Sequence, residues 1–226
     1  FVIIMEDGRK LTFASPLFIP KVAICDPDLT LGLPAMLTAA TGMDAITHCI
    51  EAFLTPNVNP PAEGVALDGL RRGWRHIERA VADGADREAR WEMMMASTEG
   101  AYAFVKGLGA VHAMSHAAGR IEALRLHHGT LNALFLPAVL RFNADACGEK
   151  YARLREAMGL GARADLADAV AAMNQRIGMP SGLAALGVTN DHMPGIVEYA
   201  QKDLAALSNP VRAGADDYAA MVAATM

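Results

Sequence analysis

Cysteine, aromatic residues and long apolar runs are all scarce in this 226-residue sequence. It contains 3 cysteines and no Cys-x-x-Cys pair, which excludes a disulfide framework and favours a cytoplasmic protein with reduced thiols. A helix that crosses a bilayer needs about 18 or more apolar residues in succession. The best candidate, 131–140, is shorter and carries an asparagine and a proline, so we predict no membrane-spanning segment.

Charges of one sign do not gather anywhere in the sequence. The 20 Lys and Arg residues face 25 Asp and Glu residues, which gives a net charge of -5. Proteins that bind nucleic acid or anionic membranes carry basic patches that neutralise phosphates, and this sequence has no such run. We therefore expect no nucleic-acid or membrane partner, and a small molecule is the favoured ligand.

Alanine is abundant, and most of the chain has helical periodicity. The sequence contains 44 alanines but only 7 Phe, 4 Tyr and 2 Trp, and alanine has the highest helix propensity. From residue 34 onward, apolar residues recur at the helical spacing, with glycine or proline between the periodic segments. The predicted fold class is all-α, a helical bundle. Helices are predicted at 35–54, 61–82, 86–106, 108–120, 128–145, 148–158, 164–178, 191–205 and 214–225.

The first 33 residues have a different pattern. Short apolar or β-branched runs at 2–5, 10–14 and 22–25 predict strands, and residues 6–9 predict a hairpin turn between the first two. Three short strands rarely form a stable layer alone. We therefore expect residues 1–33 to be the β-rich edge of a domain whose other strands lie upstream, and residues 34–226 to form one helical domain.

Two pairs of potential metal ligands have helical spacing. Asp44 and His48 are four residues apart, and so are His112 and His116. Residues i and i+4 of an α-helix differ by about 40° in direction and 6 Å in height, so each pair points to one side of its helix. Imidazoles in an alanine-rich interior need partners for both ring nitrogens, and a divalent cation supplies one. Two facing pairs therefore predict a metal site, and one carboxylate with two or three imidazoles suits Fe(II) or Zn(II).

Two further features bear on this site. The consecutive residues His127 and His128 point about 100° apart on a helix, so only one of them can reach the same ion. Glu51 lies on the helix face of Asp44 and His48. There it is either a hydrogen-bond acceptor for a ligand imidazole or a solvated surface charge. The spacing leaves both questions open.

Five strings of the sequence carry a family resemblance. They are DPDLT at 26–30, TGMDAITHCIEAF at 41–53, GLGAVHAMSH at 107–116, HGTLNA at 128–133 and SNPVR at 208–212. Their order and spacing resemble those of the iron-containing (group III) alcohol dehydrogenases over nearly the whole chain. The glycine-rich phosphate-binding motif of this family is not among these residues and is expected upstream of them.

The resemblance implies a two-domain enzyme of the dehydroquinate synthase-like type. In such an enzyme an N-terminal α/β domain binds NAD or NADP, and a C-terminal helical domain holds Fe(II), or Zn(II), in the cleft between the domains. This chain resembles the second domain, so residues 34–226 are expected to be the metal-binding catalytic domain. The resemblance assigns Asp44, His48, His112 and His128 as metal ligands and implies a homodimer.

Other family positions correspond to residues outside the ligand set. His116 is similar to a histidine that lies near the nicotinamide without binding the ion, and it is the implied catalytic residue. Lys10 is similar to a lysine that approaches the ribose and phosphate of the cofactor. Leu29 and Leu33 belong to a segment that resembles one bordering the nicotinamide, so all three are implied cofactor-binding residues.

The implied function is hydride transfer between NAD(P) and a primary alcohol or aldehyde whose oxygen the metal polarises. Three alternatives stay open. One is a glycerol dehydrogenase or dehydroquinate synthase relative on the same scaffold. Another is a metal-dependent hydrolase that uses Glu51 as its general base. The third is a catalytically silent, isolated helical domain.

Overall fold

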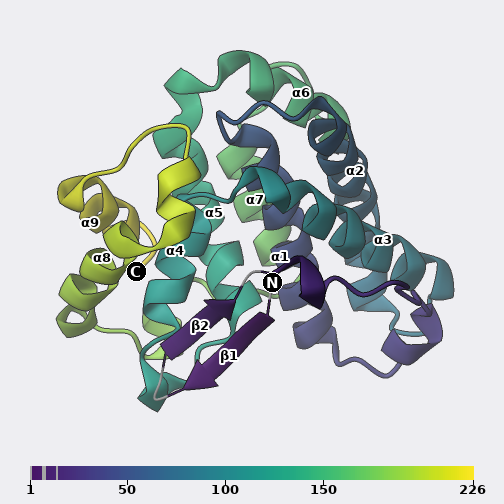
Figure 1. Cartoon of the computed structure of the whole chain (residues 1–226), viewed down its shortest axis with the longest axis horizontal. Coiled ribbons are helices and arrows are strands. Elements are labelled where there is room, and N and C mark those ends of the chain that lie inside the picture. The colour runs from purple at the N-terminus through teal and green to yellow at the C-terminus, as the bar shows by residue number, and fades with distance from the viewer. Residues whose placement is uncertain (1, 7–8, 14) are drawn as a thin grey trace.

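The structure, a computed structural model, describes residues 2–6, 9–13 and 15–226 and consists mainly of packed helices (Figure 1). Within that part of the chain, no helix combines the length and the apolar character that crossing a membrane requires. The helices are α1 (Ala35–Leu54), α2 (Pro60–Ala82), α3 (Arg87–Ala103), α4 (Ala110–Ala118), α5 (His128–Asn143), α6 (Gly148–Met158), α7 (Leu166–Arg176), α8 (Met193–Lys202) and α9 (Ala215–Ala223).

These bounds confirm the predicted all-α class and the predicted helices, several of which are shorter at their ends. The helix expected at 86–106 begins after Asp86, whose carboxylate accepts a hydrogen bond from the Ala89 N–H and so caps α3. It is α-helical only to Ala103, and Phe104–Lys106 continue as the 3-10 turn η3. Gly107 then ends the turn with a φ of 115°, a conformation that residues with a Cβ rarely adopt.

The N-terminal residues form a two-stranded hairpin. Strand β1 (Val2–Glu6) pairs antiparallel with β2 (Arg9–Phe13). Residues 7 and 8 of the predicted turn and residue 14 of the predicted second strand lie outside the described residues.

The prediction of a third strand at 22–25 is wrong. Among the described residues the only sheet is the pair of β1 and β2, and 22–25 have no regular secondary structure and no strand partner. The side chains of Val22 and Ile24 are 73% and 86% exposed. Because the segment has no neighbouring strand for cross-strand contacts, its β-branched residues alone do not make it a strand.

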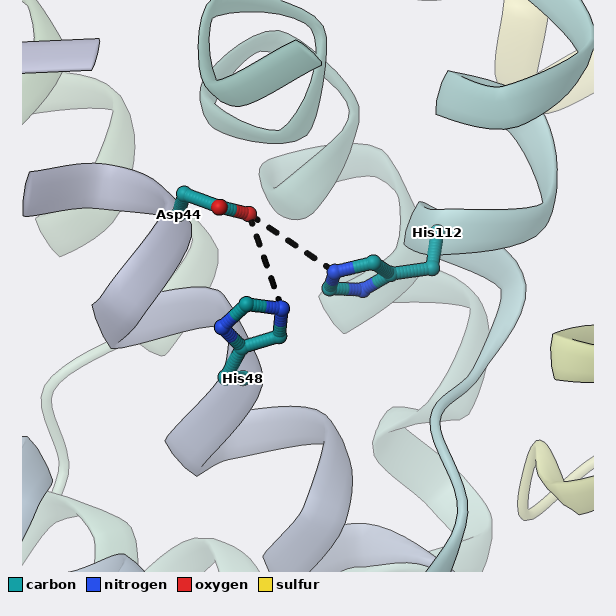
Figure 2. A group of neighbouring side chains, drawn as sticks. All are labelled: Asp44, His48 and His112. Atoms are coloured by element: carbon teal, nitrogen blue, oxygen red, sulfur yellow. Dashed lines mark ion pairs between the residues drawn. The ribbon is translucent and has the colours of Figure 1, made fainter. Parts of the chain in front are cut away.

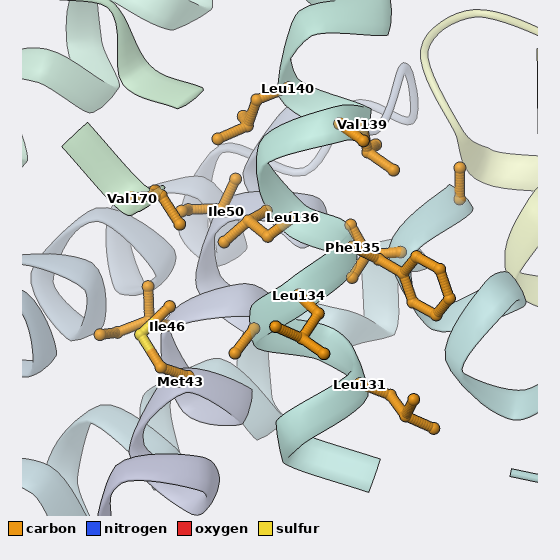
Figure 3. Packing of buried hydrophobic residues seen from close by; sticks show 14 of the residues in the cluster. Met43, Ile46, Ile50, Leu131, Leu134, Phe135, Leu136, Val139, Leu140 and Val170 are labelled. Atoms are coloured by element: carbon orange, nitrogen blue, oxygen red, sulfur yellow. The ribbon is translucent and has the colours of Figure 1, made fainter. Parts of the chain in front are cut away.

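Helix α1 lies at the centre of the bundle and carries two of the predicted ligands. Helices α2 and α3 pack against one side of it and α5 against another, while α4, α8 and α9 form a second group beside α5 (Figure 1). Met43, Ile46 and Ile50 of α1 share a buried apolar cluster with Leu134 and Leu136 of α5 (Figure 3). This packing fixes the position of α1 relative to α5.

Gly129 allows α5 to approach α1 closely. A Cβ at this position would collide with the backbone carbonyl of Ala40 and would lie 3.3 Å from the Cβ of Asp44. We expect Gly129→Ala to lower the free energy of unfolding by about 1 to 3 kcal/mol, the usual cost of overpacking, and to move His128 away from Asp44. Gly64→Ala is the matched control, because a Cβ there meets nothing within 4 Å. Urea denaturation of both variants measures the effect, and equal stabilities would argue against the close helix contact.

A cluster of charges lies between α2 and α3. Arg72 donates hydrogen bonds to Asp68 at 2.7 Å and to Glu92 at 2.8 Å, and its Nε lies 3.3 Å from Glu99. Within the described part of the chain, Oε2 of Glu99 is buried and has no hydrogen-bond partner. Burial, assisted by the charge of Asp68, raises the pKa of Glu99 to about 7 from its ordinary value of 4.5.

This raised pKa predicts a pH-dependent stability. Between pH 4.5 and 7 the folded protein holds a proton on Glu99 that the unfolded chain releases, so the free energy of unfolding falls as the pH rises through this window. Glu99→Gln is neutral at every pH and is expected to remove that loss. One pKa unit corresponds to about 1.4 kcal/mol, and partial exposure reduces this value. The free energy of unfolding of the variant, relative to that of wild type, should therefore rise by on the order of 2 kcal/mol between pH 4 and pH 8. Urea denaturation at both pH values tests this, and parallel pH dependences would refute it.

Candidate metal centre

Helices α1, α4 and α5 bring four of the predicted residues together at one point. Asp44 and His48 lie one turn apart on α1, His112 lies on α4, and His128 is the first residue of α5. The Nε2 atoms of His48, His112 and His128 lie 3.8, 3.7 and 3.5 Å from the same atom, Oδ1 of Asp44. Figure 2 shows the carboxylate of Asp44 facing the rings of His48 and His112. The predicted ligand set is therefore a spatial cluster.

The geometry of this cluster fits a divalent transition metal. Nitrogen and oxygen atoms that bind one ion tetrahedrally at about 2.1 Å lie roughly 3.4 Å from one another, which is close to the distances between Asp44 and the three imidazoles. Asp44, His48 and His112 offer ligand atoms that all lie within 4.8 Å of one another. One carboxylate and three imidazoles suit Fe(II) or Zn(II), whereas Mg²⁺ and Ca²⁺ prefer oxygen ligands alone.

His128, and not His127, is the member of the consecutive pair that reaches the cluster. His127 precedes the first turn of α5 and is exposed. His128 is half-buried, and its Nδ1 forms a hydrogen bond of 2.8 Å with Oγ of Ser115 on α4. This bond holds the ring with its Nε2 directed toward Asp44.

Glu51 is a hydrogen-bond acceptor within the site, so the alternative of a solvated surface charge is wrong. Its side chain is 4% exposed. Oε2 accepts from Nδ1 of His112 at 2.6 Å, and Oε1 accepts from the backbone N–H of Val111 at 2.8 Å. The backbone N–H of Ala110, the first residue of α4, donates to Oδ1 of Asn209 at 3.1 Å. Because these N–H groups have no acceptor inside α4, Glu51 both caps the helix and orients His112.

The charges of the cluster favour an ionised Asp44 and a neutral His48, and they favour a positive charge at His112. Burial alone raises the pKa of Asp44, but the close contact with His112 and the charges of His48 and His128 outweigh it and hold the pKa well below its ordinary range. Burial and the neighbouring charge of His112 lower the pKa of His48 to about 4. Burial lowers the pKa of His112, but Asp44 and Glu51 raise it to about 9. The two carboxylates thus stabilise a positive charge here, which a metal ion supplies in place of a proton.

Asn132 belongs to the site, although the sequence analysis did not identify it. Its Nδ2 donates to Oδ1 of Asp44 at 2.6 Å and lies 3.2 and 3.1 Å from Nε2 of His112 and His128. Its Oδ1 is buried and has no hydrogen-bond partner among the described residues. An unpartnered oxygen beside four convergent ligand atoms fits a site for a cation and a polar ligand better than a closed core. Its position four residues after His128, on the same side of α5, could have identified it from the sequence.

His116 lies beside the ligands but does not face Asp44. Its ring stacks on that of His128, with centroids 5.2 Å apart, and meets the ring of His112 edge-on at 5.9 Å. Its Nδ1 forms a hydrogen bond of 2.9 Å with Oδ2 of Asp203. Of the two histidines on α4, His112 therefore belongs to the metal cluster, and His116 packs beside it. No sequence signal identified Asp203, which lies 87 residues after His116.

Two of the predicted cofactor-binding residues, Leu29 and Leu33, lie before α1 and away from the cluster. Leu29, on the turn η2 (Pro27–Thr30), is 84% exposed. Leu33 is half-buried and lines an open pocket of about 260 Å³ together with Thr30. Helix α1 begins nine residues before Asp44, so its start lies roughly 14 Å from that ligand. Lys10 lies on β2, and its side chain is outside the described part of the structure.

The fold is a helical bundle that brings potential metal ligands together, and comparisons with known proteins identify its family. Residues 38–226 match the family described as "Fe-containing alcohol dehydrogenase family, C-terminal". The chain belongs to the iron-containing alcohol dehydrogenase family.

Curated relatives of the chain are dehydrogenases by name. The chain is 56% identical over 232 residues to 4-hydroxybutyrate dehydrogenase of Cupriavidus necator, an alignment that covers 100% of this chain and 61% of the relative. It is 39% identical over 225 residues to 1,3-propanediol dehydrogenase of Klebsiella pneumoniae, covering 96% of this chain and 58% of the relative. The chain thus spans about 60% of the length of these relatives.

Solved structures of the family have the same fold. The structure superimposes on a 1,3-propanediol oxidoreductase with a TM-score of 0.84 at 38% identity, covering 89% of this chain and 55% of the other. It superimposes on an iron-containing alcohol dehydrogenase from Thermococcus thioreducens with a TM-score of 0.88 at 28% identity, covering 99% of this chain and 59% of the other. The predicted fold, the helical C-terminal domain of an iron-containing alcohol dehydrogenase, is confirmed.

Proposed function

We propose that the protein transfers hydride between NAD(P) and a small primary alcohol or aldehyde at a metal ion held by Asp44, His48, His112 and His128. The observation that carries this proposal is the convergence of three Nε2 atoms on Oδ1 of Asp44 within 3.8 Å. Membership of the iron-containing alcohol dehydrogenase family supports the reaction class. We propose Fe(II) as the ion, with Zn(II) as the alternative that the same donors accept.

When bound, such an ion supplies Lewis-acid polarisation of the substrate oxygen. The residues of the chain supply the rest of the site. Glu51 keeps the proton of His112 on Nδ1, so that Nε2 presents its lone pair. His116 is the proposed proton carrier for the substrate hydroxyl, because its imidazole lies against the rings of the ligands His112 and His128.

The substrate class is proposed from the relatives. Their names specify 4-hydroxybutyrate, 1,3-propanediol and lactaldehyde as compounds on which those proteins act. All three are short, and each carries a second polar group besides the reacting hydroxyl or aldehyde. We therefore propose a short bifunctional alcohol or aldehyde as the substrate of this protein.

The nicotinamide cofactor and the domain division are part of the same proposal. One relative is named an NAD-dependent methanol dehydrogenase, and a neighbouring structure is a sulfoacetaldehyde reductase in complex with NAD+. We propose that residues 34–226 are the metal-binding catalytic domain, that residues 1–33 are the edge of a nucleotide-binding domain, and that Lys10, Leu29 and Leu33 lie on the cofactor side. Three free cysteines, Cys25, Cys49 and Cys147, support a reducing compartment such as the cytoplasm. Assembly as a homodimer stays a prediction.

The hydrolase alternative is disfavoured by the surroundings of Glu51. A general base needs a free carboxylate oxygen within reach of a water molecule. Both oxygens of Glu51 already accept hydrogen bonds from α4, and its side chain is 4% exposed. We therefore assign Glu51 to ligand orientation.

The test of the function is a metal and cofactor screen. The protein is loaded anaerobically with Fe(II) or Zn(II) and assayed with NAD+ and NADP+ against 4-hydroxybutyrate, 1,3-propanediol and glycerol, and with NADH and NADPH against lactaldehyde. We expect metal-dependent turnover with a short bifunctional substrate. Turnover with glycerol alone would favour the glycerol dehydrogenase alternative. Ester hydrolysis without nicotinamide would favour the hydrolase, and no turnover at all would favour a silent helical domain.

His116→Ala is expected to separate proton transfer from metal binding within the site. The variant should keep the metal, because His116 does not face Asp44, and should lose about 10² to 10⁴-fold in kcat, the usual contribution of a general acid or base. Metal analysis by mass spectrometry and steady-state kinetics on the same preparation measure the two effects. Loss of the metal together with the rate would make His116 a ligand and overturn this division.

A further inference from the structure

We propose that Asp203 is the positioning residue of His116: it holds the imidazole in the tautomer with the proton on Nδ1 and leaves Nε2 to exchange a proton with the substrate. This inference rests on the proposed function, in which His116 carries the proton, and it names Asp203 as the residue that positions His116. The contact joins two distant segments, α4 and the turn η8 (Leu204–Ser208), whose first residue follows Asp203. This hydrogen bond links α4 to the C-terminal part of the chain beside the metal centre.

The carboxylate of Asp203 is itself fixed in direction. Its Oδ2 lies 2.9 Å from Nδ1 of His116, and its Oδ1 accepts the backbone N–H of Ala205 at 2.8 Å, which caps η8. The side chains of His116 and Asp203 are 28% and 21% exposed, so the hydrogen bond lies largely inside the protein. A carboxylate held by the backbone on one oxygen presents the other as a rigid acceptor, and an acceptor at Nδ1 selects the Nδ1–H tautomer.

The neighbouring histidines, His112 and His128, also have a hydrogen-bond partner at Nδ1 that leaves Nε2 available. Nδ1 of His112 is bonded to Glu51 at 2.6 Å, and Nδ1 of His128 is bonded to Oγ of Ser115 at 2.8 Å. Each of these bonds leaves Nε2 directed at Asp44. Asp203 plays for His116 the part that Glu51 plays for His112, but it orients a ring that contacts the ligand rings and is not itself one of the proposed ligands.

The chemistry of the step explains why an acidic partner is needed. In alcohol oxidation the substrate hydroxyl would give its proton to Nε2 of His116, which would pass it on to solvent, while a bound nicotinamide would accept the hydride from the carbon. In aldehyde reduction the hydride and the proton move in the opposite direction. While Nε2 carries the proton, the ring is an imidazolium, and the carboxylate of Asp203 stabilises it without taking the proton itself.

The test compares substitutions that separate positioning from helix capping. Asp203→Asn presents an amide in place of the carboxylate, and Asp203→Ser keeps a good N-cap for η8 but is too short to reach His116. Asp203→Glu restores the carboxylate. Asp165→Asn is the matched control, because Asp165 is an exposed aspartate that caps α7 through the N–H of Asp168 at 2.9 Å and lies outside the site.

All variants are prepared as the zinc-loaded protein and compared with wild type and His116→Ala. We expect Asp203→Asn and Asp203→Ser to lower kcat about 10 to 100-fold with KM and metal content unchanged, and Asp203→Glu to recover most of the rate. Nitrogen-15 NMR of selectively labelled histidine should show the His116 proton moving from Nδ1 in wild type toward Nε2 in Asp203→Asn. Asp165→Asn should match wild type in every measurement.

Three results would overturn the positioning role. Wild-type kcat in Asp203→Asn and Asp203→Ser would do so, as would an unchanged His116 tautomer. Loss of zinc in these variants would also count against it, because Asp203 would then support the ligands and not His116. The tautomer measurement needs no turnover, so absence of NAD(P)-dependent activity in wild type would contradict the proposed function while the NMR result still decides the role of Asp203.

Discussion

His112→Ala is expected to abolish both metal binding and turnover. His112 is the most buried of the ligands, with its side chain 1% exposed, and it stands between two carboxylates: its Nε2 faces Asp44 at 3.7 Å and its Nδ1 bonds Glu51 at 2.6 Å. Alanine removes one of four donors and leaves Glu51 with an unpartnered oxygen in the interior. Loss of a ligand together with its oriented partner should reduce metal affinity by more than about 100-fold, beyond what loss of an orienting partner alone costs.

The measurement is metal stoichiometry after dialysis, followed by the rate of nicotinamide reduction. His76→Ala is the matched control, because His76 is a half-buried histidine on α2 whose Nδ1 contacts the carbonyl of Arg72 at 2.9 Å, away from the cluster. The control should keep both metal and rate. A His112→Ala protein that still held one ion per chain would show that the ion is bound elsewhere.

Glu51→Gln is expected to have the second largest effect, although Glu51 is not a ligand. Its carboxylate accepts hydrogen bonds from Nδ1 of His112 and from the backbone N–H of Val111. Glutamine has the same size but has one oxygen and an NH₂ group, so one of these donors loses its acceptor inside the protein. We expect the metal affinity to fall about 10 to 100-fold and the free energy of unfolding to fall by about 1 to 3 kcal/mol.

Isothermal titration with Zn(II) and urea denaturation of the metal-free protein measure these two effects separately. Glu78→Gln is the control, since Glu78 is exposed and its only described ion pair is with Arg176 on the surface. It should leave both quantities near their wild-type values. Unchanged zinc affinity in Glu51→Gln would mean that His112 keeps its orientation without this carboxylate.

Most of the fold could be predicted from the sequence because helices are encoded locally. The alanine-rich periodic segments and their glycine and proline boundaries predicted α1 to α9 within a few residues. The failure at 22–25 has a physical cause: β propensity needs a neighbouring strand, and this segment has none among the described residues. The end of α3 was predicted too late because the change to a 3-10 turn at Phe104 depends on the packing around η3.

The site was predictable where its residues share a helix turn. The spacing identified Asp44 with His48 and His112 with His116. The family resemblance then chose His112 and His128 as ligands. The orientation of Glu51 could not be decided from its spacing, because burial by α4 is a tertiary effect. The role of Asp203 could not be predicted for the same reason, because its contact with His116 joins residues 87 positions apart in the sequence.

The central claim is that Asp44, His48, His112 and His128 bind one metal ion. X-ray absorption spectroscopy of the protein loaded with one equivalent of Zn(II) tests it most directly, because the spectrum counts imidazole rings around the ion. The account predicts three imidazole nitrogens and at least one carboxylate oxygen at about 2.0 to 2.2 Å. A spectrum with fewer than three imidazoles, or one dominated by sulfur, would contradict it.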